Sequence, residues 1–340
     1  MIKTRITELF DLKYPIIQAP MGPFYTTELC VAVSEAGGLG VLSHTNLMGK
    51  NSIKEMKKNI NYVIEHTDKP FGINIRTARM QPDAIPIARM VAKMINQNPK
   101  VREQLVYGVT SAGSPRKVAR IWKKKCPTLQ HFHVAPALYL AQKVINAECD
   151  GLVVTGIEGG GHQSYEKIST LVLEQQAVRE FPDVPLVACG GFASPEGVAM
   201  GIAGGADAIA MGTRFITTNQ SEFHQKYKDL IYPASARDTL ITTGAFGPIR
   251  LLKNKYSLEH GQVLAKEEKI AQEESFSVEE LQKEMERYEL VYRGDVENGA
   301  VLAGQTVGLI EHAMDVDDIL STFTKKAEKQ LKRSVGKIHS

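Results

Sequence analysis

The sequence predicts an α/β fold, a (β/α)₈ TIM barrel with a helical cap after the eighth strand. Eight short apolar segments alternate with amphipathic segments of helical spacing over about 215 residues, which is the repeat of such a barrel. Most of the apolar segments lack in/out alternation, as is typical of parallel strands covered on both faces. The expected strands are residues 15–18, 38–43, 71–75, 105–110, 131–135, 151–155, 185–189 and 208–211.

The amphipathic segments between these strands predict the outer helices. They are residues 27–36, 53–65, 83–96, 115–125, 137–147, 171–180 and 195–203. A serine followed by a proline often starts a helix, and both Ser114 and Ser194 stand in that position. An open doubly wound sheet is the alternative fold. It predicts a Gly-x-Gly-x-x-Gly loop after the first strand, whereas residues 18–23 read Gln-Ala-Pro-Met-Gly-Pro.

The pattern changes after the eighth strand. Residues 216–303 are polar and charged with helical periodicity, most clearly at Val278–Tyr292, and predict a helical cap that forms a substrate domain. Residues 304–340 regain apolar spacing and predict helices that close the barrel. The expected division is therefore a barrel over residues 1–215, a cap over 216–303 and a closing segment over 304–340.

Composition argues against several classes of protein. The 340 residues are 43% hydrophobic, which suffices for a large core without disulfides or metals. The net charge is only +3, so we expect no nucleic-acid partner, and the basic residues 325–333 have the spacing of a solvated helix face. No apolar run approaches the ~20 residues of a membrane span, and no signal-type segment follows Met1. With four separated cysteines, we expect a cytoplasmic protein and leave a homodimer open.

The segment after the sixth expected strand gives the clearest functional signal. Three glycines, residues 159–161, let the backbone approach a flat or charged ligand, and His162 follows them directly. Imidazole titrates near neutral pH, so His162 is the candidate acid/base group at a carbon acid or an enolate. A lone histidine is more often structural, but this one stands at the C-terminal end of a barrel strand, where active sites lie. Glu158 is a candidate for orienting the loop.

Two further sites suit a phosphate. Gly190 and Gly191 follow the seventh strand, and Gly212 and Thr213 follow the eighth. Backbone N–H groups at these two places in a barrel commonly bind phosphate, although either pair alone is equally consistent with a tight turn.

A large flat ring would find partners at two other strand ends. Ala19, Pro20, Met21 and Gly22 offer backbone and a soft side chain after the first strand. Asn74, after the third strand, offers an amide that can donate and accept. Core packing for Met21 and a turn cap for Asn74 are the competing interpretations.

The remaining histidines and cysteines give weaker signals. His131 and His133 lie on one side of the fifth strand, and His44 follows the second strand, where it could line a pocket. Their positions give no ligand spacing together with His162, so no metal is expected. Cys189 precedes Gly190, but no base partner is evident and a nucleophilic role is not expected.

Several segments together resemble the nitronate monooxygenase (2-nitropropane dioxygenase) superfamily. They are residues 15–22, 36–40, 71–74, 158–162, 190–192 and 211–215, and the resemblance extends over nearly the full chain. Residues 3–9, 294–296 and 304–309 resemble its enoyl-acyl-carrier-protein reductase II branch in particular, and an NADH:quinone reductase branch shares much of this C-terminal part.

The resemblance implies an FMN-dependent oxidoreductase that acts on a small molecule. It implies that the phosphate lies on Gly190, Gly191, Gly212 and Thr213, and that the ring lies near Ala19, Pro20, Met21, Gly22, Asn74, Gly160 and Gly161. Thr155 and Met211 belong to the same implied cofactor site, and His162 matches the catalytic histidine of the family.

Three functions are compatible with these residues. We favour a nitronate monooxygenase, which oxidises alkyl nitronates with O₂, because residues 19–21 resemble the nitronate enzymes more than the Gly-Gly-Met of the reductase. The alternative is an enoyl-thioester or quinone reductase with NAD(P)H as electron donor, which the two ends of the chain favour. A barrel that binds a flavin or phosphate ligand without catalysis is the third, against which His162 and both glycine sites argue.

The chain departs from its apparent relatives at five positions. Thr155 and Ala210 replace glutamines, and Val134 replaces a lysine of some nitronate enzymes. Gln163 and Ser164 follow His162, where many relatives have a glycine at the second position. These departures bear on the identity of the substrate more than on FMN binding.

Overall fold

The computed structural model describes residues 2–78, 81–244, 247–259 and 278–337. Its largest sheet has eight parallel strands in the order β1-β9-β8-β6-β5-β4-β3-β2. A parallel bridge between Ile17 and Leu39, with Gln18 N donating to Leu39 O at 2.9 Å, joins β1 to the chain entering β2 and closes the sheet. The expected TIM barrel is confirmed. Its strands are β1 (Ile16–Gln18), β2 (Gly40–Leu42), β3 (Phe71–Arg76), β4 (Leu105–Ser111), β5 (Gln130–Ala135), β6 (Gly151–Thr155), β8 (Leu186–Cys189) and β9 (Ala208–Met211).

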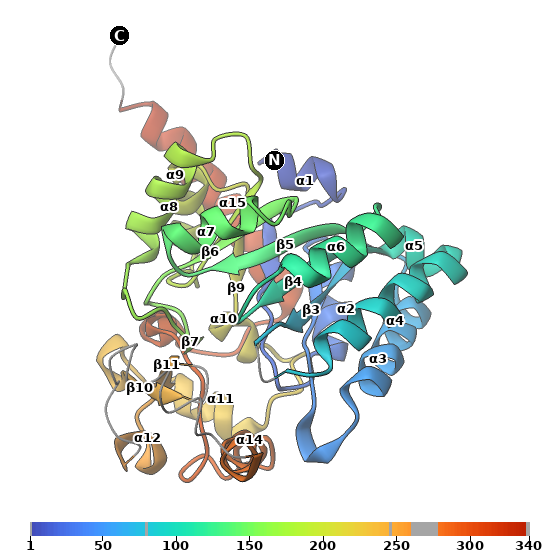
Figure 1. Cartoon of the computed structure of the whole chain (residues 1–340). Helices are drawn as coiled ribbons and strands as arrows, with labels where there is room; N and C mark the ends of the chain where they lie inside the picture. Colours follow the sequence, from blue (N-terminus) through green and yellow to red (C-terminus); the bar gives the residue numbers. More distant parts are fainter. Residues whose placement is uncertain (1, 79–80, 245–246, 260–277, 338–340) are drawn as a thin grey trace.

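Helices surround the barrel, and each of the seven expected between strands is present (Figure 1). α15 (Val316–Val335) packs against α9 and α2 and takes the eighth place in the ring. The other outer helices are α2 (Thr27–Glu35), α3 (Ser52–His66), α4 (Ala84–Gln97), α5 (Pro99–Gln104), α6 (Arg116–Lys125), α7 (Leu138–Ile145), α8 (Thr170–Glu180) and α9 (Pro195–Gly204).

One of the two serine caps was expected wrongly. Ser194 does cap α9, since its Oγ accepts from Gly197 N at 3.2 Å. Ser114 does not cap α6, whose N-cap is Pro115 with no side-chain hydrogen bond. Pro115 has near-helical angles (φ −73°, ψ −20°), so the chain turns one residue later than the Ser-Pro signal suggests. Ser114 is thereby left on the wall of the cavity described below.

Apolar side chains fill the N-terminal end of the barrel. α1 (Arg5–Leu9), which the sequence did not predict, lies at this end and is followed by Phe10 (Figure 1). The Phe10 ring packs edge-on against Tyr107 at 5.6 Å between centroids and lies 6.2 Å from Phe132. Only the opposite end, where parallel strands place their C-termini, is left for a ligand.

The segment after β9 forms a cap over that end (Figure 1). It contains helices, as expected, and also a β-hairpin that the sequence did not predict. β10 and β11 pair antiparallel, and β11 pairs with the two-residue strand β7 that carries His162. The elements after β9 are α10 (Thr213–Ile216), α11 (Gln225–Ile231), β10 (Thr239–Gly244), β11 (Gly247–Leu252), α12 (Lys255–Glu259), α14 (Val278–Tyr292) and the 3₁₀ turn η3 (Gln305–Leu309), whereas β7 (Gly161–His162) lies between β6 and α8.

The expected cap and the expected absence of a membrane span can be compared with the structure only over the described residues. Residues 260–277 of the expected cap lie outside the described residues. Among the residues that are described, no helix has the length and apolar character to cross a membrane.

A buried carboxylate between α8 and α9 makes stability depend on pH. Glu174 is 3% exposed, lies against Gly204, and has an Oε1 atom with no hydrogen-bond partner among the described residues. Burial raises its pKa to about 7. Because this value exceeds that of an unfolded chain, ~4.3, the folded state holds the proton more tightly, and stability is lost as pH rises through 7.

We therefore expect Glu174→Gln to become more favourable as the pH rises. The difference in unfolding free energy between variant and parent grows by about 2 kcal/mol from pH 5 to pH 8, measured by urea unfolding. Glu180→Gln, an exposed site on the same helix, is the control and shows no such trend. A difference for Glu174→Gln that is the same at both pH values contradicts the assignment.

Candidate active site

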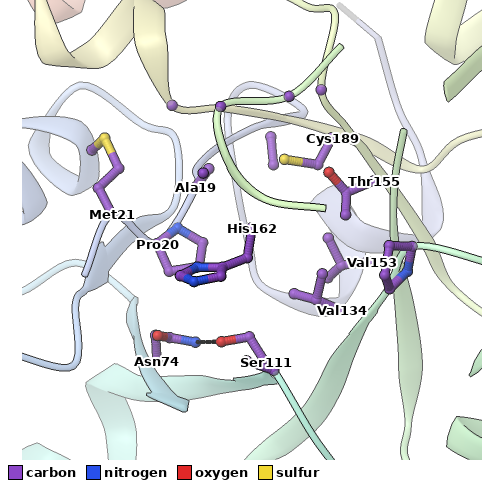
Figure 2. Close-up of a pocket in the computed structure, with 18 of the residues that line it drawn as sticks. Ala19, Pro20, Met21, Asn74, Ser111, Val134, Val153, Thr155, His162 and Cys189 are labelled. Atoms are coloured by element: carbon purple, nitrogen blue, oxygen red, sulfur yellow. Dashed lines mark hydrogen bonds between the residues drawn. The ribbon is translucent and has the colours of Figure 1, made fainter. Parts of the chain in front are cut away.

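A cavity of about 860 Å³ opens at the C-terminal end of the barrel. Its volume falls in the range of small-molecule and cofactor sites, ~300–1,000 Å³. Figure 2 shows the His162 ring pointing into it, with Ala19, Asn74 and Thr155 on its walls. The structure brings together His162 and twelve of the thirteen predicted cofactor residues: Ala19, Pro20, Met21, Gly22, Asn74, Thr155, Gly160, Gly161, Gly190, Gly191, Gly212 and Thr213.

Met211 is the exception. Successive residues of a strand point to opposite faces, so Ala210 faces the barrel interior and Met211 faces the outer helices. The Met211 side chain is fully buried there, and its carbonyl accepts from Ala19 N at 2.9 Å. Its position supports the chain at the rim, and the structure does not place it in the site.

The loop between β6 and α8 is held in shape by Thr170, the first residue of α8. Gly156 N donates to Thr170 Oγ1 at 3.0 Å, and Thr170 N donates to Glu158 Oε2 at 2.9 Å. The Thr170 hydroxyl also lies 3.0 Å from Glu158 Oε2 and 2.9 Å from the Gly190 carbonyl oxygen, and its proton serves one of them at a time. Glu158 is thus a loop-orienting residue, because its carboxylate is occupied by Thr170.

The cap hairpin fixes the backbone that carries His162. His162 pairs with Ile249 of β11, and Gln163 N donates to the Pro248 carbonyl at 2.7 Å. The Gln163 side chain folds back, donating from Nε2 to the Gly159 carbonyl at 2.6 Å. Arg250 Nε donates to the Ile157 carbonyl at 2.8 Å. The imidazole is therefore presented from a short strand braced on both sides.

The glycines of the rim adopt backbone angles that other residues avoid. Gly161, Gly190 and Gly191 have φ of +81°, +85° and +86°. A Cβ atom on Gly161 would meet no protein atom within 4 Å, so the space beside this backbone belongs to the cavity. This geometry fits close approach of a flat ligand to the peptide plane. The helix after Gly212 is only four residues long. The ends of β8 and β9 therefore offer an anion backbone amides and not a helix dipole.

The strand-five histidines are neutral. Thr110 Oγ1 lies 2.8 Å from His131 Nε2 and 2.7 Å from His133 Nδ1. Burial lowers the pKa of His131 to about 3 and that of His133 to about 4. His133 lines the cavity, whereas His131 and His44 do not. The described part of the chain holds no group of three or more His, Cys, Asp or Glu that could bind a metal ion.

Sequence reasoning missed several residues of the cavity wall. Arg76 was detectable, because it follows Asn74 by two residues on one strand and so shares its face. Tyr227 of α11 comes from the expected cap and Thr306 of η3 from the expected closing segment, and no local pattern relates them to the barrel. The positions at which the chain departs from its apparent relatives all line the cavity: Val134, Thr155, Gln163, Ser164 and Ala210.

The family follows from a comparison with known proteins. The model of the family described as nitronate monooxygenase matches residues 3–326. The chain belongs to the nitronate monooxygenase family. The expected class of enzyme, a flavin-dependent oxidoreductase, is thereby confirmed.

The named relatives and solved structures that resemble this chain carry the names of different enzymes. A probable nitronate monooxygenase of Staphylococcus saprophyticus is 30% identical over 289 residues, 75% of this chain and 80% of that protein. A (3aS,4S,5R,7aS)-5-hydroxy-7a-methyl-1-oxo-octahydro-1H-indene-4-carboxyl-CoA dehydrogenase of Rhodococcus jostii is 31% identical over 262 residues, 76% of this chain and 69% of that protein. The structure of FabK from Thermotoga maritima superposes with a TM-score of 0.81 at 30% identity, covering 99% of this chain and 100% of that one.

The contribution of the Thr170 hydroxyl to the stability of the cavity rim can be tested by substitution. Thr170→Val keeps the shape but leaves Gly156 N and the Glu158 carboxylate short of a partner, so we expect unfolding free energy to fall by about 1–3 kcal/mol in urea. Thr324→Val is the matched control, because Thr324 is 3% exposed and its hydroxyl has no partner among the described residues. Its expected effect is near zero or stabilising. Equal effects of the two substitutions would contradict this role of Thr170.

Proposed function

We propose that this protein is an FMN-dependent nitronate monooxygenase that oxidises alkyl nitronates with O₂, with His162 as its acid/base group. The observation that carries the proposal is the position of His162. Its half-buried ring leaves a braced strand at the rim and points into a cavity whose opposite walls are glycine backbone and apolar side chains (Figure 2).

The cavity suits FMN in two places. The backbone amides of Gly190, Gly191, Gly212 and Thr213 offer donors for a phosphate at the ends of β8 and β9. Asn74 Nδ2 donates to the Val109 carbonyl at 3.1 Å and to Ser111 Oγ at 3.2 Å, which leaves Oδ1 as the atom it offers to a ring N–H. When bound, FMN supplies the electron transfer that amino acid side chains cannot perform.

The side chains of the cavity position the substrate and move a proton. With a neutral nitroalkane, His162 takes the proton from the carbon that bears the nitro group and so forms the nitronate, which is the species that is oxidised. Val134, Val153 and Phe223 line the same cavity and exclude water from that carbon. Gln163 and the β11 pairing hold the His162 backbone, so the ring needs little reorganisation to reach its partner.

The second candidate is an NAD(P)H-dependent enoyl-thioester or quinone reductase at the same FMN site. Two observations favour it. FabK matches this chain from end to end, and the Rhodococcus relative bears the name of a CoA-thioester dehydrogenase. In this case the proton held by His162 would go to the carbon beside the thioester carbonyl.

Anaerobic stopped-flow absorbance separates the two reactions. We expect an alkyl nitronate to bleach the flavin within the turnover time and NADH or NADPH to leave it oxidised. Rapid bleaching by either nicotinamide, with none by nitronates, would replace the proposal by the reductase. A flavin that no donor reduces would support a ligand-binding barrel without catalysis.

A substitution at His162 tests its role. We expect His162→Ala to keep the yellow colour and to lower kcat by ~10²–10⁴-fold, the contribution of a general acid/base. His66→Ala, an exposed residue at the end of α3, is the control and leaves kcat unchanged. Unchanged turnover in His162→Ala would sink the assignment.

A further inference from the structure

Arg76 is a cation on the cavity wall, and Asp83, the carboxylate that acts on it electrostatically, forms no direct ion pair with it. It ends β3, and its guanidinium Nη2 donates to Asn46 Oδ1 at 2.9 Å. Its Nε atom is buried without a hydrogen-bond partner among the described residues. Within the described chain no carboxylate lies within 4.0 Å of the guanidinium. A half-buried cation of this kind costs free energy unless an anion completes the site.

The acidic groups of this neighbourhood and of the cavity wall take their hydrogen bonds from residues other than Arg76. Asp83 accepts from His44 Nε2 at 3.0 Å, from Gln81 Nε2 at 3.1 Å and from the Ser52 hydroxyl. Glu158 is the only acidic residue among the described residues of the cavity wall, and Thr170 occupies its carboxylate. The described cavity wall carries two cations, Arg76 and Lys143, against the single carboxylate of Glu158, which is an excess of positive charge.

Arg76 is held rigidly at the rim by its backbone. Arg76 N donates to His44 Nδ1 at 3.0 Å. Since His44 Nδ1 is then the acceptor, its Nε2 carries the proton that goes to Asp83, and the imidazole is neutral. Burial lowers the pKa of His44, which agrees with that tautomer. His44 is thus a positioning residue for Arg76, rather than a lining residue of the pocket as its sequence position suggested.

The phosphate of FMN cannot be the missing anion under the proposed function. The closed sheet runs β1-β2-β3-β4-β5-β6-β8-β9, so β3 and β8 lie on opposite sides of the barrel. Gly190 and Gly191 at the end of β8 would hold that phosphate. Arg76 faces the other side of the cavity and would meet a second anion.

A second donor lies beside Arg76. Ser111 of β4 is the register partner of Arg76 across the sheet, and it also lines the cavity. Its Oγ accepts a hydrogen bond from Asn74 Nδ2 at 3.2 Å, as Figure 2 shows. The hydroxyl proton of Ser111 is therefore not used in this contact and can be donated to another group. A guanidinium fork and a hydroxyl side by side suit a planar two-oxygen anion such as a carboxylate or a nitronate.

We propose that Arg76 and Ser111 form a subsite for a planar oxyanion of the substrate, on the side of the cavity opposite to the glycine backbones of β8. The inference rests on the proposed function in taking this cavity as the substrate site and in placing the FMN phosphate at the ends of β8 and β9. The anion is either the nitronate group itself or a carboxylate elsewhere on the same substrate.

Calorimetric titration with butanoate tests the subsite on the protein as purified, without turnover. We expect butanoate to bind and its neutral isostere butanamide to bind far more weakly. Arg76→Gln weakens butanoate binding about 10- to 100-fold, the worth of a charge-assisted hydrogen bond. Arg76→Lys gives a smaller loss, and Ser111→Ala a loss of about 5-fold. These two milder variants carry the test if Arg76→Gln does not fold.

Lys143→Met is the matched control, since Lys143 also lines the cavity but is exposed and lies over the Tyr139 ring. We expect it to leave butanoate binding unchanged. Absence of butanoate binding, an unchanged affinity in the Arg76 variants, or an equal loss in Lys143→Met would overturn the subsite. Because absorbance reports flavin separately, failure of the FMN proposal is distinguishable from failure of this one.

Steady-state kinetics then identify the source of the anion. If the nitronate group occupies the subsite, Arg76→Gln raises KM for an unsubstituted alkyl nitronate by a similar factor. If KM is unchanged while butanoate binding is lost, the subsite takes a separate carboxylate of the natural substrate. Both outcomes assign the subsite to a planar oxyanion.

Discussion

The hydrogen bonds of the Thr170 hydroxyl hold together the rim of the cavity. The hydroxyl joins the start of α8 to the loop after β6 and to the chain after β8, through Gly156, Glu158 and Gly190. The loop contains several glycines, which have too much conformational freedom to hold one shape alone. Its shape is therefore imposed by neighbours. Thr170 fixes the first part, and β11 with the Gln163 side chain fixes the last part, where His162 stands.

The barrel separates the chemical tasks around its rim. Neutral backbone donors lie at the ends of β8 and β9, the acid/base candidate follows β6, and the cationic side chain of Arg76 ends β3. Parallel strands bring these ends together although they are far apart in sequence. The apolar plug at the N-terminal end, with Phe10 against Tyr107, lies opposite to the cavity at the C-terminal end of the strands. One side of the cavity, at β8 and β9, thus offers neutral backbone donors, and the opposite side, at β3, offers a positive charge.

The barrel and most of its rim were predictable because they rest on local signals. Eight buried parallel strands read as apolar runs, and glycines after them mark close backbone approach. The hairpin β10–β11 was missed because residues 216–303 were assigned as a whole by helical periodicity, although residues 239–252 contain short apolar runs. Met211 does not line the cavity, because the alternation along β9 turns its side chain towards the outer helices. The role of His44 depends on Asp83 and Arg76, which only the folded chain brings together.

The absorbance spectrum of the purified chain tests the central claim most directly, that this cavity holds FMN. We expect flavin bands corresponding to one flavin per chain, with FMN released intact when the protein is denatured. After removal of the flavin, added FMN restores the bands. A colourless protein that takes up no FMN would contradict the assignment of the glycine backbones, and with it the role given to His162.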